Sequence, residues 1–256
     1  MSLIKTPEQI NIMREGGKIL ADILLDLYNS SDIGTKALDL ENKFLKLCEI
    51  HDVIPGCKGY TADGYMPPFP TGLCVSINDQ SVHCYPKEGV VLRDGDLITI
   101  DTVIKHKGMF VDCSFAKGIG NINSQTQKLI ETSRGALNEA EKITSAGVKI
   151  GLLSHTIQRY VEANGYNVLV DYAGHGIGER MHESPDVPCV GDPNEGAILK
   201  SGMTICIESL VCEGKPNVTE VSDWETKMSD GKRFLQFEHT ILVTDNGYEI
   251  LTPLAV

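Results

Sequence analysis

GDLITIDTVIKHKGMFVDCSFA, residues 95–116, is the stretch that decides the fold. Two runs rich in Ile, Val, Thr and Phe flank a short polar break that ends in glycine, which is typical of a β-hairpin. A two-residue turn at 106–107 would place Asp101 directly opposite Asp112, and a turn at 107–108 would pair them diagonally. Because side chains alternate along a strand, either turn leaves both carboxylates on one face of the hairpin. A three-residue turn would separate them unless a bulge restored the register.

Two carboxylates that face each other across a ladder repel, and burial among aliphatic side chains would add a desolvation cost. The pair therefore lies either on a solvated face of the hairpin or around a divalent cation, which recruits carboxylate oxygens. The hairpin alone leaves both interpretations open.

The composition is that of a globular protein with one sizeable core, built as a single domain or as two packed halves. A net charge of −12 argues against a nucleic-acid-binding surface. The first thirty residues contain no apolar run long enough for a signal peptide or a membrane span, so we expect a cytoplasmic protein. Eight cysteines without a C-x-x-C pair predict free thiols rather than a zinc ribbon or disulfides.

Hydrophobic periodicity predicts four amphipathic helices, and a Thr6 cap followed by proline marks the start of the first one. These helices are expected at about 7–28, 35–51, 124–144 and 153–164, and further strands at 73–78, 203–208 and 234–243. Residues 54–72, rich in Pro and Gly, are predicted to form a long loop that walls a pocket. Each half thus has two helices and strand-rich sequence, which predicts a single domain, 1–256, with related halves at about 1–120 and 121–256.

The second half supplies three more ionisable candidates. The glycine-rich segment 174–182 cannot form a helix, so its histidines, His175 and His182, are expected on a loop. Glu208 and Glu238 lie within or directly after apolar strand patterns. Each glutamate could occupy an exposed edge of a strand, but a buried one needs a partner because desolvation costs several kcal/mol.

Together these residues form a set of four carboxylates and one imidazole, sufficient for two divalent cations: Asp101, Asp112, His175, Glu208 and Glu238. With this set in view, the chain resembles the type I methionine aminopeptidases of the bacterial kind, which lack an N-terminal zinc-finger extension. The resemblance covers nearly the whole chain. It is carried by Ser76-Ile77-Asn78 with His83, the paired aspartates, the segment 174–178, Ile207-Glu208 and the segment 236–240.

The resemblance implies an α+β pita-bread fold, in which two pseudo-twofold halves each pack two helices on a mainly antiparallel sheet. It implies that Asp101 binds one metal ion, that His175 and Glu208 bind the other, and that Asp112 and Glu238 bridge them. Metal-activated water would then attack the first peptide bond of a chain that begins with methionine. His182 would contact the carbonyl oxygen, His83 would contact the substrate amide nitrogen, and Glu208 would shuttle the proton.

A carboxylate-rich set with one histidine and no thiolate fits Mn²⁺, Fe²⁺ or Co²⁺ at least as well as Zn²⁺. The methionine pocket should be apolar, and its expected lining is Cys57, Tyr60, Phe69, Cys74, Met181 and Trp224. For Trp224 and for the cysteines, ordinary core positions are the alternative. The resemblance further implies a cytoplasmic monomer that acts on nascent chains near the ribosome.

The sequence departs from the family pattern at four positions near the expected site: Cys84, Met181, Cys206 and Ser209. These departures bear on the shape of the pocket and on the tolerated second residue. Three other functions are open. An Xaa-Pro dipeptidase would keep the metal ligands but usually has an extra N-terminal domain. Creatinase-like members dispense with metals, and a non-catalytic binding protein of this fold would be expected to have lost ligands.

Overall fold

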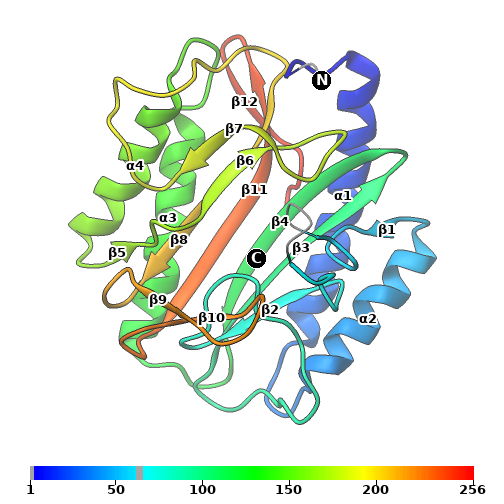
Figure 1. The fold of residues 1–256 in the computed structure, drawn as a ribbon, viewed down its shortest axis with the longest axis vertical. Helices are drawn as coiled ribbons and strands as arrows, with labels where there is room; N and C mark the ends of the chain where they lie inside the picture. Colours follow the sequence, from blue (N-terminus) through cyan, green and yellow to red (C-terminus); the bar gives the residue numbers. More distant parts are fainter. Residues whose placement is uncertain (1–2, 62–65) are drawn as a thin grey trace.

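The computed structural model describes residues 3–61 and 66–256, so residues 62–65 of the predicted loop lie outside the described part. Within it, four helices flank a large sheet, with α1 and α2 on one side of the view in Figure 1 and α3 and α4 on the other. Their bounds are α1 Pro7–Ser30, α2 Ala37–Ile50, α3 Ser124–Lys142 and α4 Ile150–Ala163. None of these helices is long and apolar enough to cross a membrane.

The main sheet follows the order β1-β3-β4-β11-β8-β6-β7, and each strand pairing within it is antiparallel. Its strands are β1 Ile54–Pro55, β3 Leu97–His106, β4 Met109–Gly118, β11 Phe234–Thr244, β8 Thr204–Cys212, β6 Ala173–Gly176 and β7 Glu183–Pro188. Three short strands extend it, β2 Cys74–Ile77 on β3, β5 Asn167–Val168 on β8 and β12 Gly247–Ile250 on β11. A separate hairpin joins β9 Val218–Glu220 to β10 Thr226–Met228.

The β3–β4 hairpin turns at Lys107 and Gly108, whose φ angles are both positive, at 45° and 92°. Two successive positive φ angles are what a two-residue turn needs to match the twist of its strands, and glycine meets this need without strain. The register pairs Asp101 with Ser114 and Asp112 with Val103. The two aspartates are therefore diagonal neighbours on one face, the second of the two registers that the sequence allows.

The helices cover the face of the sheet opposite to the two aspartates. On that face α1 packs on β3 and β4, and α3 packs on β8 and β11. Tyr28 of α1 meets Phe115 edge-on with ring centroids 5.3 Å apart. Ser133 of α3 hydrogen-bonds Ser209 of β8 through their hydroxyls at 2.7 Å. Because side chains alternate along each strand, the neighbours of Phe115 and Ser209 project away from the helices. The face without helices therefore carries the polar candidates.

Several predicted elements differ from the structure, since β8 ends four residues beyond the predicted 203–208 and β1 occupies the start of the predicted loop 54–72. Helix α4 begins at Ile150, three residues before the predicted start at Leu153, because Gly151 allows the first turn to approach the Asp192 carbonyl oxygen closely. His175 lies on strand β6 rather than on a loop, so that prediction is wrong. The glycines beside it allow the neighbouring strand to approach closely, because a Cβ at Gly174 would lie 2.3 Å from the carbonyl oxygen of Cys206.

Candidate metal centre and adjoining pocket

The five predicted metal ligands lie on five strands that are consecutive in the sheet. The register places Glu238 opposite both Ser114 and Glu208, which sets the shared face of β4, β11 and β8. One ligand then comes from each of β3, β4, β11, β8 and β6, in the order Asp101, Asp112, Glu238, Glu208 and His175. Residues distant in the sequence thus meet on the open face of the sheet.

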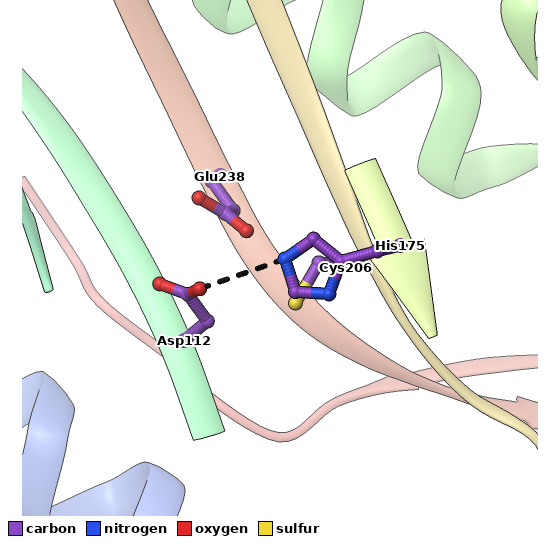
Figure 2. Close-up of side chains that lie close together, drawn as sticks. All are labelled: Asp112, His175, Cys206 and Glu238. Atoms are coloured by element: carbon purple, nitrogen blue, oxygen red, sulfur yellow. Dashed lines mark ion pairs between the residues drawn. The ribbon is translucent and has the colours of Figure 1, made fainter. Parts of the chain in front are cut away.

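Figure 2 shows that Asp112, His175, Cys206 and Glu238 point toward one another. One potential ligand atom from each of them lies within 4.8 Å of all the others, and Asp112 Oδ2 is 3.8 Å from His175 Nε2. The Nδ1 atom of His175 donates a hydrogen bond to the Gly176 carbonyl oxygen at 2.9 Å. This bond leaves the Nε2 lone pair free to face a cation.

The thiol of Cys206 is the member of this group that sequence reasoning missed. The sequence-based set contained no thiol, whereas the structure places one among the carboxylates. The signal was present in the sequence, because Cys206 precedes Glu208 by two residues on one strand and must share its face.

The buried carboxylates of the cluster are stabilised either by protonation or by a bound cation. Burial and the neighbouring carboxylates raise the pKa of Asp112 and of Glu238 well above their ordinary values. Burial raises the pKa of Asp101 to about 6, and burial with the nearby Asp101 raises the pKa of Glu208 to about 8. The Oδ1 atoms of Asp101 and Asp112 are buried without a hydrogen-bond partner among the described residues. Unpaired carboxylate oxygens in a buried cluster fit a cation that the protein is built to hold.

The three histidines around the cluster are neutral at pH 7. Burial, together with the nearby His182, lowers the pKa of His83 and of His175 to about 4, and burial also lowers the pKa of His182. The rings of His175 and His182 meet edge-on with centroids 4.4 Å apart. His182 Nδ1 lies 2.9 Å from the Tyr60 hydroxyl oxygen. His83 has a φ of 63°, a left-handed conformation that is uncommon for this residue and that is often found at functional sites.

An apolar cavity of about 150 Å³ opens beside Asp101 and Asp112. All six residues that were predicted to line the methionine pocket border it, namely Cys57, Tyr60, Phe69, Cys74, Met181 and Trp224. Val103, which the sequence-based prediction omitted, also lines this cavity, since it shares the face of Asp101 on β3. Its volume is of the size that holds a benzene molecule in an engineered core. A single apolar side chain is therefore a fitting occupant.

A second cavity of about 350 Å³ continues from the first and is lined by the carboxylates, His175 and Tyr172. His83, His182, Asp101 and Asp112 border both cavities. A substrate that placed an apolar side chain in the first cavity would therefore present its backbone to the histidines and the carboxylate cluster.

The four departures from the family pattern fall into two groups. Met181 lines the apolar cavity, and Cys206 belongs to the carboxylate cluster. Ser209 faces α3 on the other side of the sheet, and the buried Cys84 thiol donates to the Thr226 carbonyl oxygen at 3.3 Å. The first two are thus the departures placed to affect the site directly.

The fold is that of a known class of hydrolases. The model of metallopeptidase family M24 matches residues 11–245, and the chain belongs to this family. Among its relatives, methionine aminopeptidase 1 of Bacillus subtilis is 38% identical over 256 residues, covering 98% of this chain and 99% of that protein. The methionine aminopeptidase of Escherichia coli is 35% identical over 252 residues, covering 97% and 93%.

Solved structures give the same result for the fold. The methionine aminopeptidase of Thermotoga maritima superimposes with a TM-score of 0.93 at 37% identity, covering 97% of this chain and 98% of that one. The prolidase of Pyrococcus furiosus shares the fold with a TM-score of 0.78 at 20% identity, covering 99% and 66%. The expected pita-bread fold is confirmed, and membership of a metallopeptidase family makes the chain an enzyme that uses divalent metal ions.

Proposed function

We propose that this enzyme removes the N-terminal methionine from newly made proteins by metal-assisted hydrolysis of the first peptide bond. The observation that carries the proposal is a buried carboxylate and histidine cluster that opens directly into a small apolar cavity. Relatives that are named methionine aminopeptidases and that match over nearly their full length support this reading. The prolidase of Pyrococcus furiosus, at 20% identity, speaks for the fold alone and does not favour the Xaa-Pro alternative.

The metal centre would hold two divalent ions. Asp101 would bind one ion, His175 and Glu208 the other, and Asp112 and Glu238 would bridge them. The unpartnered aspartate oxygens and the neutral His175, with Nε2 turned toward Asp112, support this assignment. Carboxylate and imidazole ligands fit Mn²⁺, Fe²⁺, Co²⁺ and Zn²⁺, and the ion used depends on its availability in the cell. Bound ions would lower the pKa of a water molecule and polarise the substrate carbonyl.

The side chains around this centre would orient the substrate and move protons. His182 would donate a hydrogen bond to the carbonyl oxygen, where negative charge develops in the transition state. His83 would contact the amide nitrogen of the substrate. Both histidines are neutral at pH 7, so each can donate from one ring nitrogen without repelling a cation. Glu208 would accept the proton from water and deliver it to the leaving amine.

Specificity for methionine would come from the apolar cavity. Phe69, Met181 and Trp224 offer polarizable surfaces that suit a thioether, and sulfur contacts with aromatic rings are favourable by about 0.3–1.5 kcal/mol. We further propose that the enzyme acts as a monomer in the cytoplasm, on nascent chains near the ribosome.

Peptide hydrolysis tests this function. Metal-free protein is reconstituted with Mn²⁺ or Co²⁺ and incubated with Met-Ala-Ser and, separately, with Ala-Pro. We expect methionine release from the first peptide, no cleavage of the second, and a loss of more than about 100-fold in Asp112→Asn, since even changes behind a ligand reach that size. Cleavage of Ala-Pro alone would favour an Xaa-Pro dipeptidase. No cleavage of either peptide by metal-loaded protein would favour a binding protein.

A further inference from the structure

Cys206 lies on the floor of the carboxylate cluster. On β8 it pairs with Thr240 of β11, two residues along from the pair formed by Glu208 and Glu238 and on the same face of the sheet. Its side chain is completely buried, and its Sγ is one of the four atoms that all lie within 4.8 Å of one another. Its hydrogen bond with Thr240 Oγ1 is long, at 3.7 Å. The sulfur is thus held against the carboxylates by the register of the sheet.

The four atoms lie within 4.8 Å of one another, slightly more than one metal ion allows, so the side chains would close in a little on a bound ion. Ligand atoms that lie about 2.0–2.3 Å from one ion are separated from each other by at most about 4.6 Å. Asp112 reaches His175 through Oδ2, and its other oxygen, the buried Oδ1, has no hydrogen-bond partner among the described residues of the same cluster. The group therefore contains two carboxylates, one imidazole and one thiol around a space that suits a cation.

We propose that Cys206 is a further ligand of the metal ion held by His175, Glu208 and the bridging carboxylates Asp112 and Glu238, and that it biases this position toward thiophilic ions. The inference rests on the metal centre of the proposed function but not on the choice of substrate. On ligation the S–H bond is replaced by a sulfur–metal bond, and the proton leaves to solvent. Thiolates select Zn²⁺ over Mn²⁺, which prefers oxygen ligands. The enzyme should therefore differ in metal preference from a site built of carboxylates and imidazole alone.

Two other thiols must be distinguished from Cys206. Cys57 and Cys74 line the adjoining apolar cavity, and Cys74 pairs directly with Asp101 in the sheet. A sulfur signal from a bound metal could therefore come from the pocket side of the cluster. Cys74→Ser is the matched control, because it removes one buried thiol beside the same carboxylates.

Cobalt spectroscopy tests the proposal without any activity measurement. Metal-free protein is titrated with Co²⁺, and a thiolate ligand is expected to give an intense near-ultraviolet charge-transfer band. The band should appear in the wild type and in Cys74→Ser and should be lost in Cys206→Ser. Bound Co²⁺ without the band in the wild type overturns the proposal, as does a band that persists in Cys206→Ser.

If Cys206→Ser fails to fold or to bind metal, a second measurement decides. X-ray absorption of the Zn²⁺-loaded Cys57→Ser/Cys74→Ser variant should show a sulfur neighbour at about 2.3 Å. A shell of oxygen and nitrogen alone would overturn the proposal. In a folded Cys206→Ser variant, the ratio of Zn²⁺ to Mn²⁺ affinity should fall roughly tenfold or more, and an unchanged ratio would overturn the claim of selectivity. Peptide hydrolysis on the same samples tests the proposed function separately.

Discussion

Lys5 and Glu183, separated by 178 positions in the sequence, form an ion pair with 2.8 Å between Nζ and Oε2. The side chains are only 3% and 7% exposed. Glu183 directly follows His182, and its other carboxylate oxygen accepts a hydrogen bond from the Arg180 backbone amide at 3.0 Å. Burial alone would raise the pKa of Glu183, but the bonds from Lys5 and Arg180 lower it. The N-terminal segment thus braces the turn that presents His182.

Removal of one partner from this buried pair should destabilise the fold strongly. We expect Lys5→Met to lower the free energy of unfolding by about 3–5 kcal/mol, because it leaves a buried carboxylate uncompensated. Lys142→Met is the control, since Lys142 is 62% exposed in its pair with Glu139 and such pairs contribute about 0–1 kcal/mol. Denaturant unfolding measures both variants. Equal effects of the two changes would contradict the bracing role.

The metal-free protein should lose stability as the pH rises from 6.5 to 8.5. The folded chain holds a proton on Glu208 up to a pKa of about 8, whereas the unfolded chain releases it near the ordinary value of 4.5. The stabilisation of the fold by this proton is complete below pH 4.5 and is lost as the pH rises through 8. Over this range the free energy of unfolding falls by at most about 1.4 kcal/mol per pH unit for one proton. The lowered pKa values of His83 and His175 change the free energy of unfolding mainly below pH 6.5.

Thermal unfolding of the metal-free protein across this pH range tests the sign of the effect. We expect a falling melting temperature in the wild type, a flatter profile in Glu208→Gln, and a higher melting temperature once metal is bound. A wild-type profile that rises with pH would show that Glu208 is not held protonated by the fold.

The apolar cavity should control which side chain is accepted. Val103→Phe would place a ring in a space of about 150 Å³, so we expect kcat/KM for Met-Ala-Ser to fall more than about tenfold, mainly through KM. The number of metal ions bound should not change. Val91→Phe, at an exposed position, is the control for a general effect of added bulk. An unchanged KM in Val103→Phe would place the methionine side chain elsewhere.

Tyr60 should assist catalysis through His182. Tyr60→Phe loses the 2.9 Å hydrogen bond that orients the His182 ring. Such a bond contributes about 1–1.5 kcal/mol, so its loss corresponds to a roughly tenfold lower kcat. Tyr248→Phe, on β12, is the matched control. Steady-state kinetics with metal-saturated protein measures both variants. A fall in metal affinity instead of kcat would mean that Tyr60 supports the metal centre rather than His182.

The hairpin and the four helices could be predicted from the sequence because each follows a simple period. Alternation in β3 and β4 put Asp101 and Asp112 on one face whichever two-residue turn was chosen. The strand position of His175 could not be predicted, because the glycines on both sides of it give no strand pattern in the sequence. Those glycines are needed because the backbone lies very close to the neighbouring strands. The spacing of Cys206 from Glu208 indicated that the two share a face, but the nearness of Cys206 to Asp112 depends on the order of strands, which local patterns do not specify.

The ligand and substrate-binding roles of the site residues stay predictions, as does the division into related halves at about 1–120 and 121–256. The pocket lining was chosen by family resemblance, and the structure brings all six residues to one cavity. Val103 was missed because an aliphatic residue inside a strand looks like any other core position.

Metal ions bound by the carboxylate cluster should be required for the release of methionine. The most direct test measures bound Co²⁺ or Mn²⁺ by equilibrium dialysis and methionine release from Met-Ala-Ser in the same samples. We predict no release without metal, a rise in release as the cluster fills, and neither binding nor release in the Asp112→Asn/Glu238→Gln double variant. Release by rigorously metal-free protein, or full metal binding by the double variant, would contradict the account.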